Sequence, residues 1–445
     1  MSEQPSATSP VEPEPADASV ATASEPPTSN EPGDEPIAGV DAALRRAVLG
    51  ANIKVAVLSV FLALVIGAVL LVVTNPTVLS DLKAVFVDIV HLKPFFGDLV
   101  TALKEIWNVI WSSYSALFTG SIVDPGAYST SGWRGVFYPL SETLTIATPL
   151  ALAGLAVALP FRAGLFNIGA QGQIIMGAII AGGIGFKLNW PFPWLLITAV
   201  LGAVVGGALW AGLAGWLKAR TGAHEVITTI MLNYIALYFL QWLLQTKFYQ
   251  RPGRSDPISP PVHNSAMYPQ FFGGNLRVHW GLFVAIGAAI FVWWLFKYST
   301  FGFKLRTVGA NSAAARTAGI NVGRVWLGAM LLGGVMAGLA ASTTLLGTEQ
   351  ALTGGIAGTL GFDAITVALL GRATPLGTVL AALLFGALQA GGVNMQSQTG
   401  ASVDIVLVLQ ALIVLFIAAP PLVRAMFRLK GPGAETMQVS KGWNG

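Results

Sequence analysis

The chain has 445 residues, of which 54% are hydrophobic and only 10% are charged, with a formal net charge of +4. A soluble domain carries about 25% charged residues, so this composition excludes a water-soluble globular protein and indicates a membrane protein. We attribute the basic excess to the ends of membrane spans and expect no nucleic-acid partner. Cysteine is absent, which excludes disulfides and thiolate catalysis, and the four histidines lack the spacing of a metal site.

Residues 1–42 differ in composition from the rest of the chain, because they are rich in Pro, Glu, Ser, Thr and Ala. Such a segment cannot bury enough apolar surface to fold, so we predict a disordered acidic tail in the cytoplasm. It is not a secretory signal, since the basic start and the early apolar core are missing. We also expect a flexible cytoplasmic tail at 431–445, which leaves 43–430 as the transmembrane domain.

The region 43–430 is expected to be all-α and to cross the membrane about ten times. A transmembrane helix needs about 20 predominantly apolar residues. The segments that meet this need are 54–74, 142–161, 164–186, 192–217, 225–245, 279–297, 325–346, 353–371, 375–391 and 402–420. The eighth, 353–371, is loosened by glycines at its start, so a half-helix that enters and turns back is an alternative to a full span.

Basic residues set the predicted orientation. Arg45, Arg46 and Lys54 flank the start of the first span, which places the N-terminus in the cytoplasm by the positive-inside rule. If the chain crosses the membrane ten times from a cytoplasmic N-terminus, Lys218 and Arg220 also lie on the cytoplasmic side, together with the basic residues that follow the last span. Both termini are therefore predicted to be cytoplasmic.

Two predicted outer segments are longer than ordinary turns. Residues 75–141 mix apolar and charged residues at helical spacing, which predicts an amphipathic helix on the outer surface. Residues 246–278 are rich in Pro, Gly and Arg, which predicts an irregular external loop. A lid or docking platform and a plain connection between spans are equal alternatives for both.

The predicted cytoplasmic segment 298–324 is too polar to span the membrane. Its three consecutive alanines favour a short helix, which Asn311 or Ser312 can cap and Gly319 can end. A second short helix is expected from Asn321. The result is a compact, basic helical hairpin suited to docking a partner protein, with a simple connector as the alternative.

Four motifs occur in an order that resembles one family of membrane proteins. They are FRAGLFNIGAQGQ (161–173), HEVITTIMLNYIA (224–236), LRTVGANSAAARTAGINV (305–322) and GFDAITVALLGRATPLGTVLAALLFGAL (361–388). The chain resembles permease subunits of bacterial ABC importers, in the branch for branched-chain amino acids, simple sugars and nucleosides. It is most similar to nucleoside importers of the basic-membrane-protein type, where motifs commonly read GLFNIGAEGQ, NEVISTIMLNYIA and GFDGIAVALLG.

The chain departs from this family pattern at few positions. Gln171 stands where Glu is frequent, which removes a charge, and His224 stands where Asn is frequent. The acidic tail and the long segment 75–141 are additions to the shorter pattern.

The resemblance implies a type II-like permease in the bacterial plasma membrane, with no enzymatic site of its own. A second permease subunit, either a related chain or a second copy, would complete the pathway. ATPase subunits would bind ATP and Mg²⁺, and an extracellular lipoprotein would deliver the solute. No GxxxxGK[ST] phosphate loop occurs in the sequence, which agrees with this division of labour. The resemblance makes 305–322 the ATPase-coupling segment, with the candidate residues Arg306, Asn311, Arg316 and Gly319.

Polar residues inside predicted spans are the candidates for the solute pathway, because amides and carboxylates are costly in lipid unless they pair or line a cavity. They are Asn167, Gln171, Gln173, Asn233, Asp363 and Thr366. Amides and a carboxylate suit a neutral solute that is rich in hydroxyls, such as a nucleoside. For Asn233, a role in joining helices and a role in the pathway are both open.

Two other functional classes compete with an ABC permease for a nucleoside. A secondary transporter driven by an ion gradient needs a titratable group in the pathway, and Asp363 is its main candidate. A membrane-embedded enzyme needs an acidic pair or a basic cluster at one leaflet, and the sequence contains neither. Within the ABC family, a sugar or a branched-chain amino acid is the alternative solute.

Overall fold

The computed structural model describes residues 57–90, 96–273 and 276–428, and these are helical, with two isolated β-bridges in the connections. The predicted tails 1–42 and 431–445 lie outside the described residues. Within the described residues the all-α prediction is confirmed. Besides the helix Val57–Thr74, the α-helices are α2 (Pro76–Val90), α3 (Phe96–Thr119), α4 (Tyr128–Arg162), α5 (Ala170–Lys187), α6 (Trp194–Thr221), α7 (Glu225–Leu244), α8 (Gly281–Tyr298), α9 (Thr300–Ala310), α10 (Ser312–Thr317), α11 (Val322–Thr344), α12 (Leu360–Leu370), α13 (Pro375–Thr399), α14 (Asp404–Ala418) and α15 (Pro420–Met426).

Seven helices of the described chain are long and apolar enough to cross a membrane, and they match seven of the ten predicted spans. The other three predicted spans, 164–186, 353–371 and 402–420, correspond to α5, α12 and α14. Of these, α12 has 11 residues and α14 has 15. At 1.5 Å per residue, α12 is about 16 Å long, roughly half of the hydrocarbon core.

The eighth predicted span is a broken segment that does not turn back. A methyl group on Gly154 of α4 would touch Val367 of α12, and the Arg162 side chain at the end of α4 reaches the carbonyl of Ala373 just beyond α12. Therefore α12 runs alongside α4 in the same direction and reaches the same end. Residues 353–371 consist of a non-helical first part and the helix α12.

The predicted amphipathic segment 75–141 contains two helices and the start of a third. The chain forms α2 and α3, which pack on each other, and α4 begins at Tyr128 although the apolar run begins only near residue 142. The first part of α4 is kinked at Gly132, whose φ of 60° is in the left-handed region. The predicted start of the second span at 142 is therefore wrong for the helix, because polar residues continue it outward.

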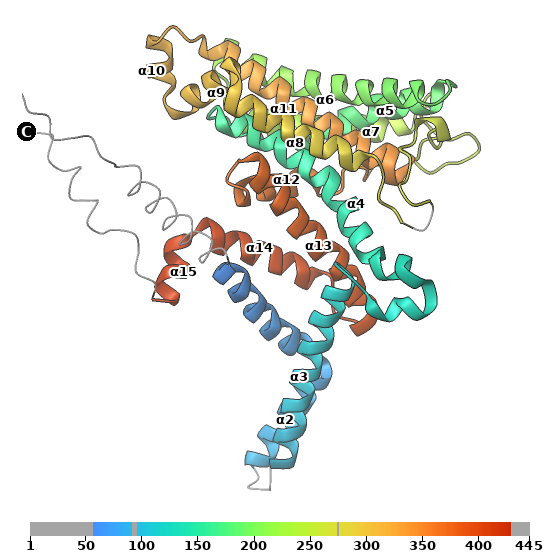
Figure 1. Ribbon diagram of the computed structural model, residues 1–445, viewed down its shortest axis with the longest axis vertical. Helices are drawn as coiled ribbons and strands as arrows, with labels where there is room; N and C mark the ends of the chain where they lie inside the picture. The colour runs from blue at the N-terminus through green and yellow to red at the C-terminus, as the bar shows by residue number, and fades with distance from the viewer. Residues whose placement is uncertain (1–56, 91–95, 274–275, 429–445) are drawn as a thin grey trace, which may run out of the picture. The chain divides into compact units, whose positions relative to one another are not determined.

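The long helices form two sets with similar packing. Helix α4 packs on α11, α12 and α13, and α11 in turn packs on α4, α5 and α6. In each set the first helix is followed by a non-helical break and a new helix start, at α5 and at α12. Helix α4 ends against α9, on the side of the bundle where α11 begins, so α4 and α11, and with them the two sets, run in opposite directions (Figure 1). Transporters with internal repeats are built in this way.

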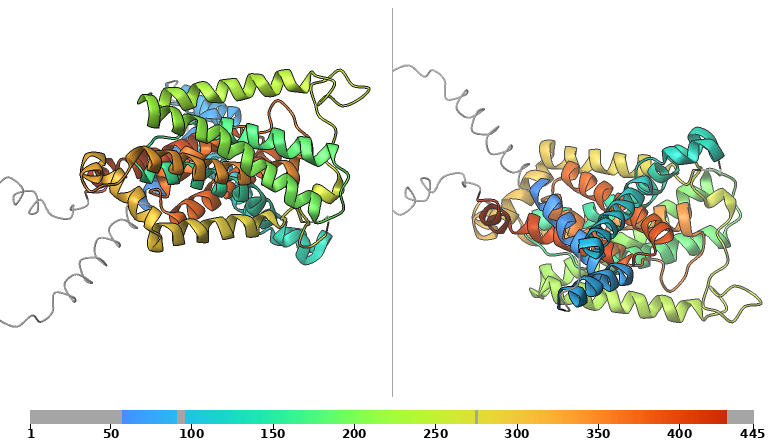
Figure 2. Two further views of the ribbon diagram at one scale, coloured as in Figure 1. Left: turned by 90° about the horizontal axis from the view of Figure 1, so that it is seen from above. Right: turned by 90° about the horizontal axis from the view of Figure 1, so that it is seen from below.

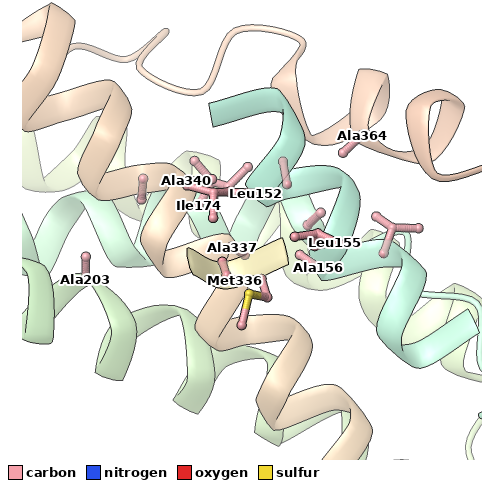
Figure 3. Packing of buried hydrophobic residues seen from close by; sticks show 14 of the residues in the cluster. Leu152, Leu155, Ala156, Ile174, Ala203, Met336, Ala337, Ala340 and Ala364 are labelled. Atoms are coloured by element: carbon pink, nitrogen blue, oxygen red, sulfur yellow. The ribbon is translucent and has the colours of Figure 1, made fainter. Parts of the chain in front are cut away.

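The core of this bundle is made of small and branched side chains. Leu152, Leu155 and Ala156 of α4 meet Ile174 of α5 and Ala337 of α11, as Figure 3 shows. All five are at most 1% exposed. Small residues allow helix backbones to approach closely, which is how helices associate in a membrane, where the hydrophobic effect gives no drive.

The two ends of the bundle carry different structures. The short helices α9 and α10 lie at one end of α8 and α11, and the connection between α7 and α8 lies at the opposite end (Figures 1 and 2). This connection is tied to the segment after α11, which has a π-helical turn at Leu345–Glu349. The backbone N–H of Val262 donates to the carbonyl of Gln350 at 2.8 Å, and that of Tyr268 donates to Leu346 at 3.0 Å.

Ser259 is the buried centre of this contact, and its removal gives a testable prediction. Its hydroxyl oxygen accepts from the backbone N–H of Leu352 at 2.8 Å, and its own N–H donates to the Leu352 carbonyl at 3.0 Å. Ser259→Ala leaves a buried N–H without a partner, which costs about 1–3 kcal/mol. We expect a lower Tm for the purified protein, with the exposed Ser255→Ala as the control. An unchanged Tm for Ser259→Ala would show that water replaces the hydroxyl.

Candidate solute cavity and polar junction

A large cavity lies toward the end of the bundle away from α9 and α10. It has a volume of about 1220 Å³ and opens between the first half of α4, the segment 355–360 and the last turns of α13. Ligand pockets typically have volumes of about 300–1,000 Å³, so a nucleoside or a sugar would fit. The lining is mixed, with hydroxyl, amide and charged side chains beside apolar ones.

Asp363 lies on one wall of the cavity, in the first turn of α12. One carboxylate oxygen, Oδ2, accepts from the hydroxyl of Thr359 at 2.8 Å and from the amide of Gln389 at 3.4 Å. The other oxygen, Oδ1, has no hydrogen-bond donor among the described residues. This arrangement fixes the side chain and leaves one anionic oxygen available to a hydroxyl or amine of a solute.

The cavity lining also includes an ion pair that was not predicted from the sequence. Glu142 of α4 and Arg277, which precedes α8, approach to 3.0 Å, and the Glu142 side chain is 17% exposed. The remaining oxygen of Glu142, Oε1, is buried and has no partner within the described chain. Glu142 could have been singled out in the sequence, because it is an acidic residue at the outer end of a predicted span. Its pairing with Arg277 could not, because the two residues are 135 positions apart.

The lining holds more acidic than basic groups. Four carboxylates, from Asp124, Glu142, Glu349 and Asp363, face two guanidinium groups, from Arg134 and Arg277. A cavity with this balance favours a neutral or cationic solute over an anion.

A buried amide pair lies deeper in the bundle, where α5 begins. Asn167 donates to Gln173 at 3.2 Å and Gln173 donates back to Asn167 at 2.9 Å; the two side chains are 1% and 2% exposed. Asn167 also donates to the carbonyl of Ala156, six residues before the end of α4, at 3.3 Å. The segment after α4 therefore turns back into the bundle by about 9 Å before α5 begins.

Two more amides join the helix starts at this depth. The Asn233 side chain donates to the carbonyl of Ile168 at 2.8 Å and accepts from the N–H of Gly172 at 2.8 Å. Gln171 donates to the carbonyl of Gly358 at 2.7 Å and accepts from the N–H of Gly361 at 2.8 Å. Gln171 thus connects the start of α5 with the start of α12 without needing the charge of a glutamate.

The predicted pathway residues divide into two groups in the structure. Asp363 lines the large cavity, whereas the amide cluster of Asn167, Gln171, Gln173 and Asn233 is hydrogen-bonded within the protein. Thr366 is half-buried one turn further along α12, away from the cavity lining. For the amides, the bonds account for a structural role, and contact with solute stays a prediction.

The predicted cytoplasmic hairpin forms at the other end of the bundle. Asn311 accepts from the N–H groups of Ala313 and Ala314, both at 3.0 Å, and so caps α10. Gly319, with a φ of 80°, follows α10 and ends it. The expected second short helix from Asn321 is wrong, because Asn321 caps the long span α11.

The basic side chains of this hairpin are exposed. Arg306 lies on α9, which the sequence did not predict as a helix, and Arg316 lies in the last turn of α10. A positive charge at a helix C-terminus is favoured by the helix dipole, so Arg316 stabilises α10 while its guanidinium faces outward. The surface therefore offers a short, capped helix with a cation at its end.

Comparison with known proteins places the chain in a family. A family described as "Branched-chain amino acid transport system / permease component" matches residues 140–418. A guanosine ABC transporter permease protein of Bacillus subtilis is 39% identical over 342 residues, which cover 76% of this chain and 98% of the relative. A nucleoside ABC transporter permease protein of Lactococcus lactis is 32% identical over 359 residues, which cover 78% and 93%. A glucose ABC transporter permease protein of Haloferax volcanii is 36% identical over 289 residues, which cover 63% and 76%. The chain therefore belongs to this family of multi-pass ABC transporter permease components.

Proposed function

We propose that the chain is the membrane-spanning permease subunit of an ATP-driven importer of nucleosides. The observation that carries the proposal is the 39% identity to a guanosine permease along 98% of that protein's length. A second nucleoside permease, 32% identical and matched over 93% of its length, supports the same solute class. The glucose permease among the relatives makes a sugar the second candidate.

The cavity supports a neutral, hydroxyl-rich solute. Asp363 presents an oxygen that accepts from hydroxyl groups, and Thr359 and Gln389 hold this carboxylate in place. The excess of carboxylates in the lining disfavours the phosphate of a nucleotide. We infer that the imported form is the nucleoside itself. The solute pathway would continue from the cavity deeper into the bundle, past the amides Asn167, Gln171, Gln173 and Asn233. Thr366 would line this pathway one turn after Asp363.

The remaining parts of the transporter come from other chains in this proposal. ATPase subunits, which bind ATP and Mg²⁺, would dock on the hairpin formed by α9 and α10. A second permease subunit would complete the pathway across the bacterial plasma membrane, and an external lipoprotein would deliver solute at the opposite end. The chain itself would catalyse no bond chemistry. Its motion would be a rigid-body rearrangement driven by closure of the ATPase subunits.

Uptake by the assembled transporter tests the proposal. We expect cells that contain the chain with its ATPase and binding-protein partners to accumulate labelled guanosine, but not glucose or leucine. Accumulation should stop when ATP is depleted and continue when an uncoupler removes the ion gradient. Loss of accumulation with the uncoupler at normal ATP would instead identify an ion-driven secondary transporter. Accumulation of glucose or leucine alone would refute the nucleoside and leave the family assignment intact.

Arg316→Glu tests the proposed coupling surface. The change reverses an exposed charge at the end of α10, where it opposes the helix dipole and any acidic groove of an ATPase. We expect the variant to insert normally into the membrane. The amount of solute taken up per ATP hydrolysed should fall about tenfold, which corresponds to a loss of about 1.4 kcal/mol in the free energy that couples the two processes. Arg220→Glu, which alters an exposed arginine at the end of α6, is the control. Equal uptake and equal ATPase stimulation in both variants would argue against a coupling role for Arg316.

A further inference from the structure

We propose that Arg162 is a positioning residue for transport, because it ties the cytoplasmic hairpin to α12 and hence to the wall of the cavity. The inference rests on the proposed function, since it assigns Arg162 a part in ATP-driven import. Arg162 is the last residue of α4, and it contacts two different elements, one with its side chain and one with its backbone.

The side chain of Arg162 holds the turn between α12 and α13. Its Nε donates to the carbonyl of Ala373 at 2.9 Å, and its Nη2 donates to the carbonyl of Arg372 at 3.4 Å. Hydrogen bonds from a guanidinium group are charge-assisted and are about twice as strong as neutral ones. The ring of Phe296, at the end of α8, lies 5.9 Å from the guanidinium carbon and helps to fix its position.

This turn has a backbone that needs such support. Arg372 and Ala373 have φ values of 52° and 48°, in the left-handed region that side chains other than glycine rarely adopt. In this region the Cβ atom of an L residue lies too close to the following carbonyl oxygen, so each such residue is strained. Two strained residues in succession persist only when their surroundings hold them. The two hydrogen bonds from the Arg162 guanidinium group to the carbonyls of Arg372 and Ala373 stabilise this turn.

The backbone of Arg162 meets the hairpin directly. A Cβ atom on Gly309 of α9 would overlap the Arg162 carbonyl oxygen and would lie 3.2 Å from the Gly164 nitrogen. No side chain therefore separates α9 from the end of α4. Because close-packed backbones are nearly incompressible, a shift of α9 at this point must move Arg162 or break the contact.

The helix α12 carries such a shift to the cavity. It is a single rigid element of 11 residues between the turn that Arg162 holds and Asp363 in its first turn. Its outer end is tied to α5 through Gln171, which bonds Gly358 and Gly361. Movement of the hairpin thus reaches the carboxylate on the cavity wall through one guanidinium and one short helix.

Two substitutions at position 162 separate positioning from simple packing. Arg162→Met keeps the length of the side chain and removes its donors, whereas Arg162→Lys keeps a cation that donates to a carbonyl. In the purified, reconstituted complex we expect Arg162→Met to retain ATP hydrolysis while guanosine uptake per ATP falls at least tenfold. Arg162→Lys should recover most of this ratio, and Arg220→Met should equal the wild type. Equal ratios in Arg162→Met and wild type would overturn the proposal, as would losses of uptake and hydrolysis in proportion.

A second variant approaches the same contact from the hairpin. Gly309→Ala places a methyl group against the Arg162 carbonyl, although alanine itself favours the helical state of α9 more than glycine does. We expect the uptake per ATP to fall at least fivefold with Arg162 still in place. Gly323→Ala is the matched control, because the nearest atom to its new methyl would be 3.4 Å away. A normal ratio for Gly309→Ala would overturn the proposal even if Arg162→Met failed to fold.

These outcomes differ from a failure of the proposed function. If the wild-type complex does not accumulate guanosine with ATP, the assignment as a nucleoside importer falls. If it does, and the Arg162 and Gly309 variants keep a normal ratio, the importer stands and the role of Arg162 falls.

Discussion

Gly334→Leu is expected to prevent the assembly of the helix bundle. Gly334 of α11 and Gly207 of α6 face each other, and a Cβ atom on either would overlap the carbonyl oxygen of the other. The nearby Gly338 approaches the carbonyl of Ala203 just as closely. Because the obstacles are backbone atoms, no side-chain rotation relieves the clash. Overpacking typically costs about 1–3 kcal/mol and more where the surroundings cannot move, so we expect at least a tenfold loss of folded protein.

The yield of monodisperse protein after detergent extraction and size-exclusion chromatography measures this effect. Gly287→Leu in α8 is the matched control, because Gly287 is an exposed glycine inside a spanning helix, and a Cβ atom added there would meet nothing within 4 Å. We expect a wild-type yield for the control. A wild-type yield for Gly334→Leu as well would show that α6 and α11 are not held in this close contact.

Features that depend on neighbouring residues were predictable from the sequence. The apolar runs predicted ten spans, since a membrane span needs about 20 consecutive apolar residues, and seven of the ten are long apolar helices in the described chain. A cap at Asn311 or Ser312 was predictable, because a cap uses backbone groups only two or three positions away, and the structure shows that Asn311 is the one that caps α10. The start of α4 was not predictable in this way, since its first turns are helical but polar.

Contacts between distant residues were not predictable from a single sequence. Gln171 bonds groups 187 and 190 positions away, and Arg162 bonds carbonyls 210 and 211 positions away. The identity of Gln171 indicates only that an amide in the bundle needs partners. Whether the partners are backbone groups or solute depends on how two helix starts meet, which is a property of the fold. The sequence therefore located the polar residues and left their roles open.

Asp363→Asn is expected to reduce guanosine uptake about 10- to 150-fold with the complex still assembled. Asparagine keeps the shape of the side chain and an oxygen that accepts from Thr359, but it removes the negative charge beside the cavity. Hydrogen bonds to charged groups contribute about 1.5–3 kcal/mol, which corresponds to this range in affinity. Initial rates of uptake in reconstituted vesicles, with the amount of complex and its ATP hydrolysis measured in parallel, give the result.

Asp404→Asn is the control for the loss of charge alone. Asp404 also lies in the first turn of a helix, α14, where it is exposed and accepts from Ser402 at 3.0 Å, away from the cavity lining. We expect uptake by this variant to equal that of the wild type.

The response to an uncoupler then distinguishes two roles that the Asp363 carboxylate could have in the pathway, which are binding the solute and carrying a coupling proton. If Asp363 binds solute in an ATP-driven importer, the residual uptake of Asp363→Asn still concentrates guanosine and still ignores the uncoupler. If Asp363 instead carries a coupling proton, the variant equilibrates guanosine without concentrating it, because the group that links solute to the gradient is gone.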